Sequence, residues 1–311
     1  MNIRKVACVG AGLIGHSWAT LFSAKGFEVT LQDIKEAQLK TAMRQIESEL
    51  EFLAQNGLME RREVKSALNR VKITLSIAEA VGDADYVQES VFETYELKKA
   101  VFRDMDAHTP EEVILASSSS GLLMTEIQKA TARPERCVVA HPWNPPLLIP
   151  LVEIVPGVKT SKQTVETTYS LMKQLGKVPV ILRKEVPGYI ANRLQAALWR
   201  EAIDLVDRGV ASVEDVDRAV WAGPGLRWAI MGPHLTFHLG GGERGIEYFI
   251  DHIGRSHSFR WDDMEAWTEI PNSGAKKVVQ GVKEMVGDRS MEELVRWRDG
   301  KLVKILKALG E

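Results

Sequence analysis

The chain has 311 residues, of which 45% are hydrophobic and 26% are charged, and its formal net charge is -2. These values are ordinary for a globular protein of two domains, and a slightly acidic chain gives no electrostatic reason to expect a nucleic-acid partner. No uncharged apolar stretch approaches the roughly 18 residues needed to cross a bilayer, so we expect a cytoplasmic protein with no membrane partner.

The first elements of the chain predict a dinucleotide site. An apolar strand, Val6–Val9, meets a glycine motif, and a second strand ends at Asp33. The motif is Gly10-Ala11-Gly12-Leu13-Ile14-Gly15. Its first glycine permits a tight turn, its second lets a pyrophosphate approach the backbone, and its third lets the next helix pack closely on the strand. A carboxylate at Asp33 can accept bonds from the adenosine ribose and repels a 2′-phosphate, so we expect NAD as the cofactor.

The elements that follow alternate between helix and strand. Apolar residues three or four apart predict an amphipathic helix over Glu36–Leu53. Short apolar runs predict strands at Val71–Ile73, Tyr86–Val87, Val113–Ala116, Cys137–Ala140 and Leu151–Val155. This alternation predicts a mostly parallel, doubly wound sheet with helices on both faces. We expect Cys8 and Cys137, inside apolar runs, to be small core residues, and no Cys/His spacing indicates a metal site.

The pattern changes at Lys184–Gly188, where proline and glycine interrupt it. We therefore expect an NAD-binding Rossmann domain over residues 1–184 and a helical substrate and dimerisation domain over 185–311. The segment Tyr189–Arg208 is apolar on all sides, which predicts a helix in the heart of the second domain or in a homodimer interface. Later helices are predicted at Val213–Trp221, Leu226–Leu239, Ile246–Ile253 and Met291–Leu309.

Two polar residues follow separate predicted strands. His141 closes the strand Cys137–Ala140, and Pro142 prevents that strand from continuing. Ser120 follows the strand Val113–Ala116. Because the carboxyl ends of parallel strands form the edge at which open sheets bind ligands, we expect both side chains beside the nicotinamide.

Glu153 interrupts an apolar strand, where a carboxylate is costly unless it is paired. His141, in the neighbouring strand, can supply the partner. The carboxylate would then fix the tautomer of the imidazole and stabilise its protonated form. The alternative is an edge-strand Glu153 that faces solvent and a His141 that is satisfied by the backbone.

Two residues of the predicted helical domain have alternative roles. Asn192 lies one turn after Pro187-Gly188, where its amide either faces the cleft or bonds to the local backbone. Arg227 lies in the apolar segment Gly225–Ile230, where a guanidinium needs an anion. That anion is either a substrate carboxylate or a structural ion-pair partner.

Several segments together resemble the 3-hydroxyacyl-CoA dehydrogenase superfamily. They are Gly10–Gly15, Ser117–Gly121, His141–Pro146, Pro150–Glu153 and Val186–Leu194. The resemblance implies that His141 is the general base and that Glu153 orients it. It implies that Ser120 and Asn192 hold the substrate oxygen. The cofactor contacts that it implies are Asp33, Glu93, Lys98 and Asn144.

Within the superfamily, Trp18 and Gly225–Trp228 are most similar to the lambda-crystallin branch, whose enzymatic members are L-gulonate 3-dehydrogenases. The segment Leu198–Ala202 is similar to bacterial L-carnitine dehydrogenases. Acyl-CoA members usually carry an aromatic pair where this chain has Pro142-Trp143, and they lack the arginine of Gly-Leu-Arg. Both departures argue against a bulky thioester substrate.

The resemblance therefore implies NAD-dependent oxidation of the 3-hydroxyl of a small, L-gulonate-like hydroxy acid, with no metal. The enzymatic alternatives are an L-carnitine 3-dehydrogenase and a 3-hydroxyacyl-CoA dehydrogenase. A non-catalytic, crystallin-like structural protein is an alternative of another class. That role would not require an intact site, and the complete set Ser120, His141, Glu153 and Asn192 argues against it.

Overall fold

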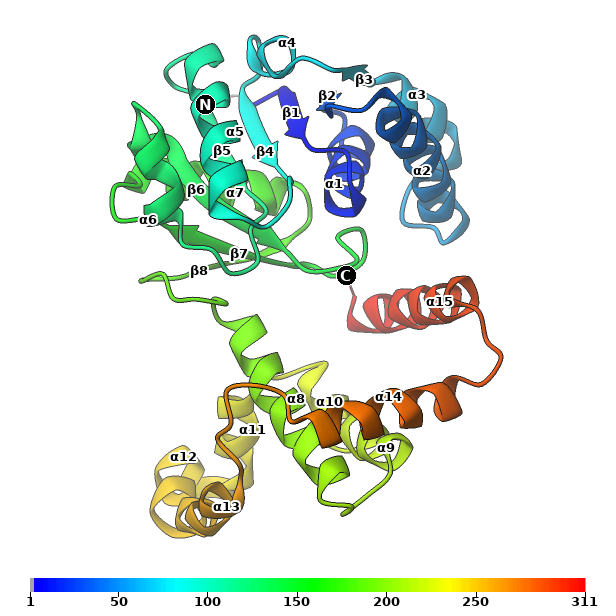
Figure 1. The fold of residues 1–311 in the computed structure, drawn as a ribbon, viewed down its shortest axis with the longest axis vertical. Helices are drawn as coiled ribbons and strands as arrows, with labels where there is room; N and C mark the ends of the chain where they lie inside the picture. Colours follow the sequence, from blue (N-terminus) through cyan, green and yellow to red (C-terminus); the bar gives the residue numbers. More distant parts are fainter. Residues whose placement is uncertain (1–2, 311) are drawn as a thin grey trace. The chain divides into compact units, whose positions relative to one another are not determined.

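The computed structural model describes residues 3–310. The chain divides into two compact units, Met1–Asn192 (unit 1) and Arg193–Glu311 (unit 2) (Figure 1). Unit 1 contains one eight-stranded sheet with helices around it, and the described residues of unit 2 form helices and turns. The predicted fold class, a doubly wound α/β domain followed by a helical one, is confirmed.

The sheet of unit 1 has the strand order β3-β2-β1-β4-β5-β6-β7-β8. Its strands are β1 (Lys5–Val9), β2 (Glu28–Gln32), β3 (Val71–Thr74), β4 (Tyr86–Glu89), β5 (Ile114–Ser117), β6 (Cys137–Pro142), β7 (Leu151–Pro156) and β8 (Val178–Ile181). Neighbours from β3 to β6 are parallel, β7 is antiparallel to β6, and β8 is parallel to β7. The strand order reverses beside β1, and open sheets bind ligands at the carboxyl ends of the strands there.

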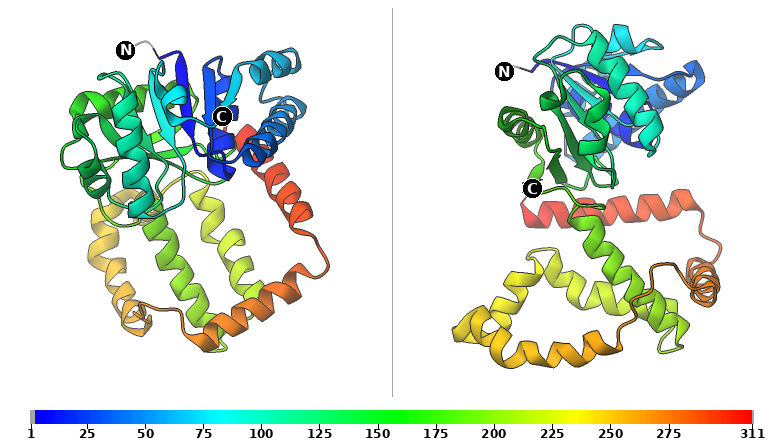
Figure 2. Two further views of the ribbon diagram at one scale, coloured as in Figure 1. Left: turned by 45° about the horizontal axis from the view of Figure 1, so that its top comes forward. Right: turned by 60° about the vertical axis from the view of Figure 1, so that its left-hand side comes forward.

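Helices cover both faces of the sheet, as Figures 1 and 2 show. One face carries α1 (Leu13–Ala24), α2 (Glu36–Gln55), α3 (Val64–Asn69) and α7 (Lys162–Gln174). The other face carries α4 (Ile77–Val81), α5 (Tyr95–His108) and α6 (Met124–Ile127). Because side chains alternate along a strand, Val6 and Cys8 of β1 join the first core and Ala7 and Val9 join the second.

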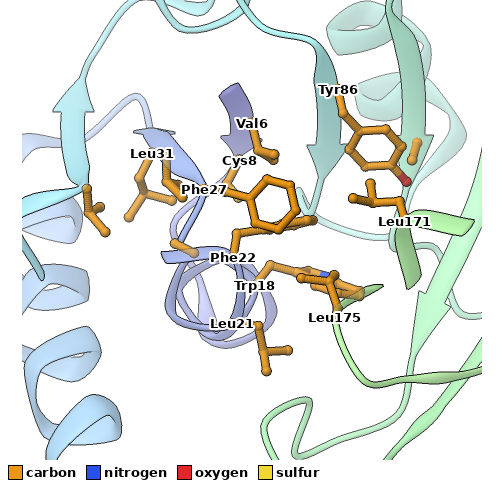
Figure 3. Close-up of a cluster of buried hydrophobic side chains, with 14 of the residues drawn as sticks. Val6, Cys8, Trp18, Leu21, Phe22, Phe27, Leu31, Tyr86, Leu171 and Leu175 are labelled. Atoms are coloured by element: carbon orange, nitrogen blue, oxygen red, sulfur yellow. The ribbon is translucent and has the colours of Figure 1, made fainter. Parts of the chain in front are cut away.

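Aromatic side chains fill the core beside α1 (Figure 3). The ring of Trp18 stacks on that of Phe22 with centroids 5.5 Å apart, and Phe22 meets Phe27 edge-on at 5.6 Å. The buried indole N–H of Trp18 donates to the Ser118 hydroxyl at 3.1 Å, so the ring is anchored at its polar end as well. Cys8 lies in the same cluster, and both cysteines are buried and free, as predicted.

The edge strand β8 was not predicted. Its second residue is Pro179, and a proline has no N–H for a ladder bond, which weakens the strand signal in the sequence. β8 stands at the end of the sheet and pairs with β7. An edge strand has one side without a ladder, so it tolerates the proline.

The helices after unit 1 differ from the predicted set at several points. They are α8 (Ala191–Asp207), α9 (Val213–Ala222), α10 (Pro224–Trp228), α11 (Pro233–Gly240), α12 (Gly245–Tyr248), α13 (Ser258–Asp263), α14 (Asn272–Val286) and α15 (Met291–Leu309). The stretch predicted over Leu226–Leu239 is helical as α10 and α11, and it is divided because a new helix begins at Pro233. The helix predicted over Ile246–Ile253 is α12 and a π-helical turn. Neither α13 nor α14 was predicted.

α8 is less buried than its sequence predicts. Leu194, Leu198 and Trp199 are 58%, 39% and 55% exposed in the single chain, whereas Ile203 and Val206 are buried. Of the two predicted alternatives, burial inside the second domain does not hold for the first half of α8, and a subunit interface stays a prediction. None of the helices in residues 3–310 has the length and apolar character needed to span a bilayer.

Candidate active site

The glycine-rich turn lies between β1 and α1. Gly10 has a φ of 96°, and a Cβ there would lie 2.7 Å from the carbonyl oxygen of Ser90. A Cβ on Gly15 would lie 1.7 Å from the carbonyl oxygen of Gly10, so only glycine lets α1 start this close to β1. Apart from its chain neighbours, no atom of residues 3–310 lies within 4 Å of the Cβ position of Gly12, which leaves its backbone open to a ligand.

The surroundings of this turn fit a dinucleotide. The first N–H groups of α1, from Leu13 and Ile14 on, have no acceptor inside the helix and can bind a pyrophosphate. Asp33, just after β2, accepts the N–H of Ala11 at 2.9 Å and that of Lys35 at 3.1 Å. These bonds hold its carboxylate beside the turn, and its remaining lone pairs can meet ribose hydroxyls.

His141 lies at the carboxyl end of β6, directly opposite Glu153 in the antiparallel strand β7. Its Nδ1 is 3.0 Å from Oε2 of Glu153, so the predicted hydrogen bond is present. Both side chains are buried, with exposures of 6% and 1%, which excludes the alternative of a solvent-facing glutamate. Because the carboxylate holds Nδ1, Nε2 is the ring nitrogen that can exchange a proton with a substrate.

The other oxygen of Glu153 is also engaged. Oε1 accepts the N–H groups of Ile190 at 2.9 Å and Ala191 at 3.0 Å, where α8 begins. Burial by itself raises the pKa of Glu153. The hydrogen bonds from His141, from these two N–H groups and from Trp143 outweigh burial and bring the pKa below its ordinary value. The carboxylate is therefore ionised at neutral pH and can neutralise an imidazolium.

Tyr189 connects the imidazole to the segment that follows Ser120. Its backbone has a φ of 54°, a left-handed conformation that is rare for a bulky residue. Its buried ring meets the ring of His141 edge-on with centroids 5.5 Å apart. Its hydroxyl donates to the carbonyl oxygen of Leu122 at 2.7 Å, so the same side chain contacts both segments.

Glu93 organises the backbone around Ser120. Its Oε1 accepts the hydroxyl of Ser119 at 2.6 Å and the N–H groups of Ser120 at 2.8 Å and Gly121 at 3.2 Å. Burial raises the pKa of Glu93, but the Ser119 hydroxyl and the Lys98 ammonium outweigh it and keep the pKa low. The hydroxyl of Ser120 is 3.4 Å from the same carboxylate oxygen, and the residue is exposed.

Lys98 is buried, with an exposure of 1%. Its Nζ lies 2.8 Å from Oε1 of Glu89 and 3.4 Å from Oε2 of Glu93. Glu89 also accepts the hydroxyl of Ser117 at 2.6 Å. The ammonium of Lys98 therefore faces two protein carboxylates. The family resemblance implies that Lys98 acts on the cofactor, and in this geometry it would do so through Glu93.

Asn192 contacts Ser120, which is distant from it in the sequence. Its Nδ2 donates to the carbonyl oxygen of Ser120 at 2.8 Å, which is a distant backbone partner and not a local one. A continuous set of contacts thus runs from His141 through Glu153 to the start of α8, and from Asn192 through Ser120 to Glu93. All of these residues belong to unit 1.

Two further predicted residues lie outside this set of contacts. Asn144 is exposed and precedes a cis peptide bond to Pro145. Arg227 belongs to unit 2, is exposed on α10, and forms no ion pair within residues 3–310. Leu226 and Ile230 beside it are exposed as well, at 70% and 66%, so burial does not force an anion onto the guanidinium, and the role of Arg227 stays a prediction.

Several residues that stabilise the site were not predicted from the sequence. Glu89 ends an apolar strand, and it could have been found by the reasoning that found Glu153, since a buried carboxylate needs a partner. Tyr189 gives no such signal, because its backbone conformation is not visible in the sequence. Lys177 is buried, and its Nζ donates to the carbonyl oxygens of Pro146 and, at 3.0 Å, Ile149, in the segment after His141.

Two family models together match most of the chain. The NAD-binding domain of 3-hydroxyacyl-CoA dehydrogenase matches residues 5–186, and the C-terminal domain of the same enzyme matches residues 188–284. The chain belongs to the 3-hydroxyacyl-CoA dehydrogenase family. It is an NAD-dependent oxidoreductase that acts on CH–OH groups.

Named relatives are similar over nearly the whole length. The L-carnitine dehydrogenase of Streptomyces griseus is 43% identical over 309 residues, which cover 99% of this chain and 91% of that protein. The L-carnitine dehydrogenase of Oceanobacillus iheyensis is 42% identical, with 98% and 97% covered. Among solved structures, FHMPC 5-dehydrogenase, an NAD+-dependent dismutase, has a TM-score of 0.84 and 30% identity, with 99% of both chains covered. The Streptomyces and Oceanobacillus relatives are both carnitine enzymes, whereas the sequence resemblance placed the gulonate enzymes first.

Proposed function

We propose that this 3-hydroxyacyl-CoA dehydrogenase family member is an NAD-dependent L-carnitine 3-dehydrogenase. The observation that carries the substrate is the 43% identity to a relative of that name over 99% of the chain. The oxidation of a secondary alcohol is supported by the buried pair of His141 and Glu153 at the carboxyl end of β6.

The residues of unit 1 suit the steps of alcohol oxidation. Nε2 of His141 takes the hydroxyl proton, and the ionised Glu153 stabilises the imidazolium that forms. The hydroxyl of Ser120 and the amide of Asn192, which are linked at 2.8 Å through the Ser120 carbonyl, bind the substrate oxygen as it becomes a carbonyl. When bound, NAD supplies the acceptor for the hydride from C3. The glycine turn, Asp33 and the segment around Glu93 and Asn144 hold that cofactor.

The charges of carnitine call for two further contacts. Its carboxylate suits a guanidinium, and Arg227, exposed and without an ion pair in the described residues, is the proposed partner. Its trimethylammonium suits the face of an aromatic ring. A free acid such as L-gulonate would use the first contact and not the second.

A substrate comparison tests the proposal. NADH formation is measured with L-carnitine, L-gulonate, 3-hydroxybutyrate and 3-hydroxybutyryl-CoA on one preparation, with wild type and His141→Ala. We expect the highest kcat/KM for L-carnitine and a fall of about 10² to 10⁴ in turnover for His141→Ala. A preference for the CoA thioester or for L-gulonate would overturn the substrate assignment, and an active His141→Ala enzyme would overturn the assignment of the base.

We also propose a homodimer. The first half of α8 exposes Leu194, Leu198 and Trp199, and several large apolar side chains exposed on one helix are typical of an interface. Light scattering should give twice the mass of the chain. Trp199→Glu should reduce that mass to that of one chain, and a monomeric wild type would exclude the dimer.

A further inference from the structure

Trp143 shares an oxygen of Glu153 with His141. The indole Nε1 lies 3.4 Å from Oε2 of Glu153, the same atom that Nδ1 of His141 meets at 3.0 Å. Trp143 is half-buried, and its ring meets the imidazole edge-on with centroids 6.4 Å apart. An indole N–H donates and never accepts, so this contact has one direction.

The contact from Trp143 affects how strongly the Glu153 carboxylate stabilises the protonated form of His141. A carboxylate oxygen that already accepts a donor has less electron density for a second one. The indole bond is present whether the imidazole is neutral or charged, so it weakens the stabilisation that the carboxylate gives to the imidazolium. It also contributes to the low pKa of Glu153, together with the bonds from His141, Ala191 and Ile190.

Hydrogen bonds hold the segment after Trp143 in place. The N–H groups of Leu148 and Ile149 donate to the carbonyl oxygen of Pro145, at 3.0 and 2.9 Å. The buried Nζ of Lys177, whose pKa burial lowers to about 7, donates to the carbonyl oxygen of Ile149 at 3.0 Å. The indole is therefore attached to an ordered loop, and its approach to Glu153 is part of the architecture of the site.

Other titratable groups lie around the pair. The buried ring of Tyr189 contacts His141, and burial raises the pKa of Tyr189 above its ordinary value. The carboxylates of Glu93 and Glu185 act on Tyr189 electrostatically. None of the three donates to Oε2 of Glu153, so Trp143 is the group whose removal changes the hydrogen bonding of that oxygen and leaves the other charges in place.

We propose that Trp143 is a positioning residue, whose N–H binds Glu153 and shifts the titration of the His141–Glu153 pair toward lower pH. The inference rests on the proposed function, in which His141 is the base and must be neutral to accept a proton. Its benefit is a site that stays active further into the acid range.

The first test uses the wild-type enzyme and no substrate. The indole ¹H–¹⁵N signals are followed by NMR between pH 5 and pH 9, roughly the range in which an imidazole titrates. We expect the Trp143 signal, assigned in the wild-type enzyme by selective isotope labelling, to shift with the same midpoint as the His141 ring. A Trp143 signal that does not respond to this titration would overturn the proposal, whether or not any variant folds.

The second test compares Trp143→Phe with Trp297→Phe, a matched loss of an indole N–H at an exposed position of α15. Phenylalanine keeps an aromatic ring and removes the donor. We expect Trp143→Phe to move the midpoint of the pair, and the acid limb of kcat/KM, upward by about half a pH unit, roughly a threefold change in the equilibrium. Trp297→Phe should move neither. An unchanged midpoint in a folded Trp143→Phe would overturn the inference.

The two proposals fail in different ways. If His141→Ala keeps its activity, the proposed function is wrong, although the NMR midpoint can still differ between wild type and Trp143→Phe. If Trp143→Phe keeps the wild-type midpoint while His141→Ala is inactive, the proposed function stands and the role of Trp143 is wrong.

Discussion

Replacing Glu153 with glutamine changes the site in a way that the structure makes specific. Glutamine keeps the shape of the side chain but has one acceptor oxygen and one NH₂ donor. In the wild type, one carboxylate oxygen accepts the backbone N–H groups of Ile190 and Ala191, and the other meets Nδ1 of His141 and the indole N–H of Trp143. The backbone donors are fixed, whereas an imidazole can move its proton to the other ring nitrogen. We therefore expect the amide oxygen to stay with the backbone and the NH₂ to face Nδ1.

The result is an imidazole in the wrong tautomer. Nδ1 then accepts a bond, Nε2 carries the proton, and the ring cannot take a proton from the substrate. We expect kcat to fall by about 10² to 10⁴, the contribution of a positioned base, with little change in the free energy of unfolding. Glu153→Ala removes the acceptor from the N–H groups of Ile190 and Ala191 as well, so it should lower the free energy of unfolding by about 1 kcal/mol or more.

Steady-state NADH formation measures kcat, and urea unfolding followed by tryptophan fluorescence measures stability. Glu166→Gln, at an exposed position of α7, is the matched control and should resemble the wild type in both. The argument from the tautomer is refuted if Glu153→Gln keeps more than about a tenth of the wild-type kcat, because a positioned base is worth far more than that. It is also refuted if Glu153→Gln loses as much stability as Glu153→Ala.

Three further predictions concern other parts of unit 1. Asp33→Ala should weaken NAD binding and narrow the preference for NAD over NADP, measured as the ratio of the two dissociation constants by calorimetry; an unchanged ratio would contradict the role of Asp33. Gly15→Ala, whose Cβ would lie 1.7 Å from the Gly10 carbonyl oxygen, should destabilise unit 1 and abolish NAD binding, whereas Gly300→Ala, in α15 with open space at the Cβ position, should keep binding. Burial, with a smaller effect of Lys25, lowers the pKa of Lys177 to about 7, so the unfolded chain holds a proton that the folded chain has lost between about pH 7 and pH 10. The free energy of unfolding should therefore rise with pH over this range, and Lys177→Met, compared by urea unfolding at both ends of the range, should remove part of that rise.

The sequence predicted the parts of unit 1 whose signals are local. Three such signals have few structural interpretations: the glycine motif, the strand before His141 and the charged residue inside β7. The structure places all three as expected. The His141–Glu153 bond was predictable because a buried carboxylate needs a partner and the next strand offered one. The catalytic roles of these residues remain predictions.

Other features depended on tertiary context and were out of reach. Pro179 weakens the strand signal of β8, and only the finished sheet shows that this strand lies at an edge. The apolar residues of α8 indicate burial, but the single chain leaves Leu194 and Trp199 exposed. The same holds for Arg227, whose apolar neighbours are exposed with it. A hydrophobic side chain indicates that burial is favourable. It does not indicate whether the same domain, another domain or a second subunit buries it.

The direct pairing of His141 with Glu153 in an antiparallel ladder has a consequence for how this site can diverge. A slip of one residue between β6 and β7 would turn the carboxylate to the opposite face of the sheet, and it would bring Val152 or Ile154 out of the core. The inward-facing apolar residues of β7 therefore favour the observed pairing. A change between Asn144 and Pro150 that keeps this register keeps the pair together, so the loop that begins beside the imidazole can differ with the substrate while the chemistry is retained.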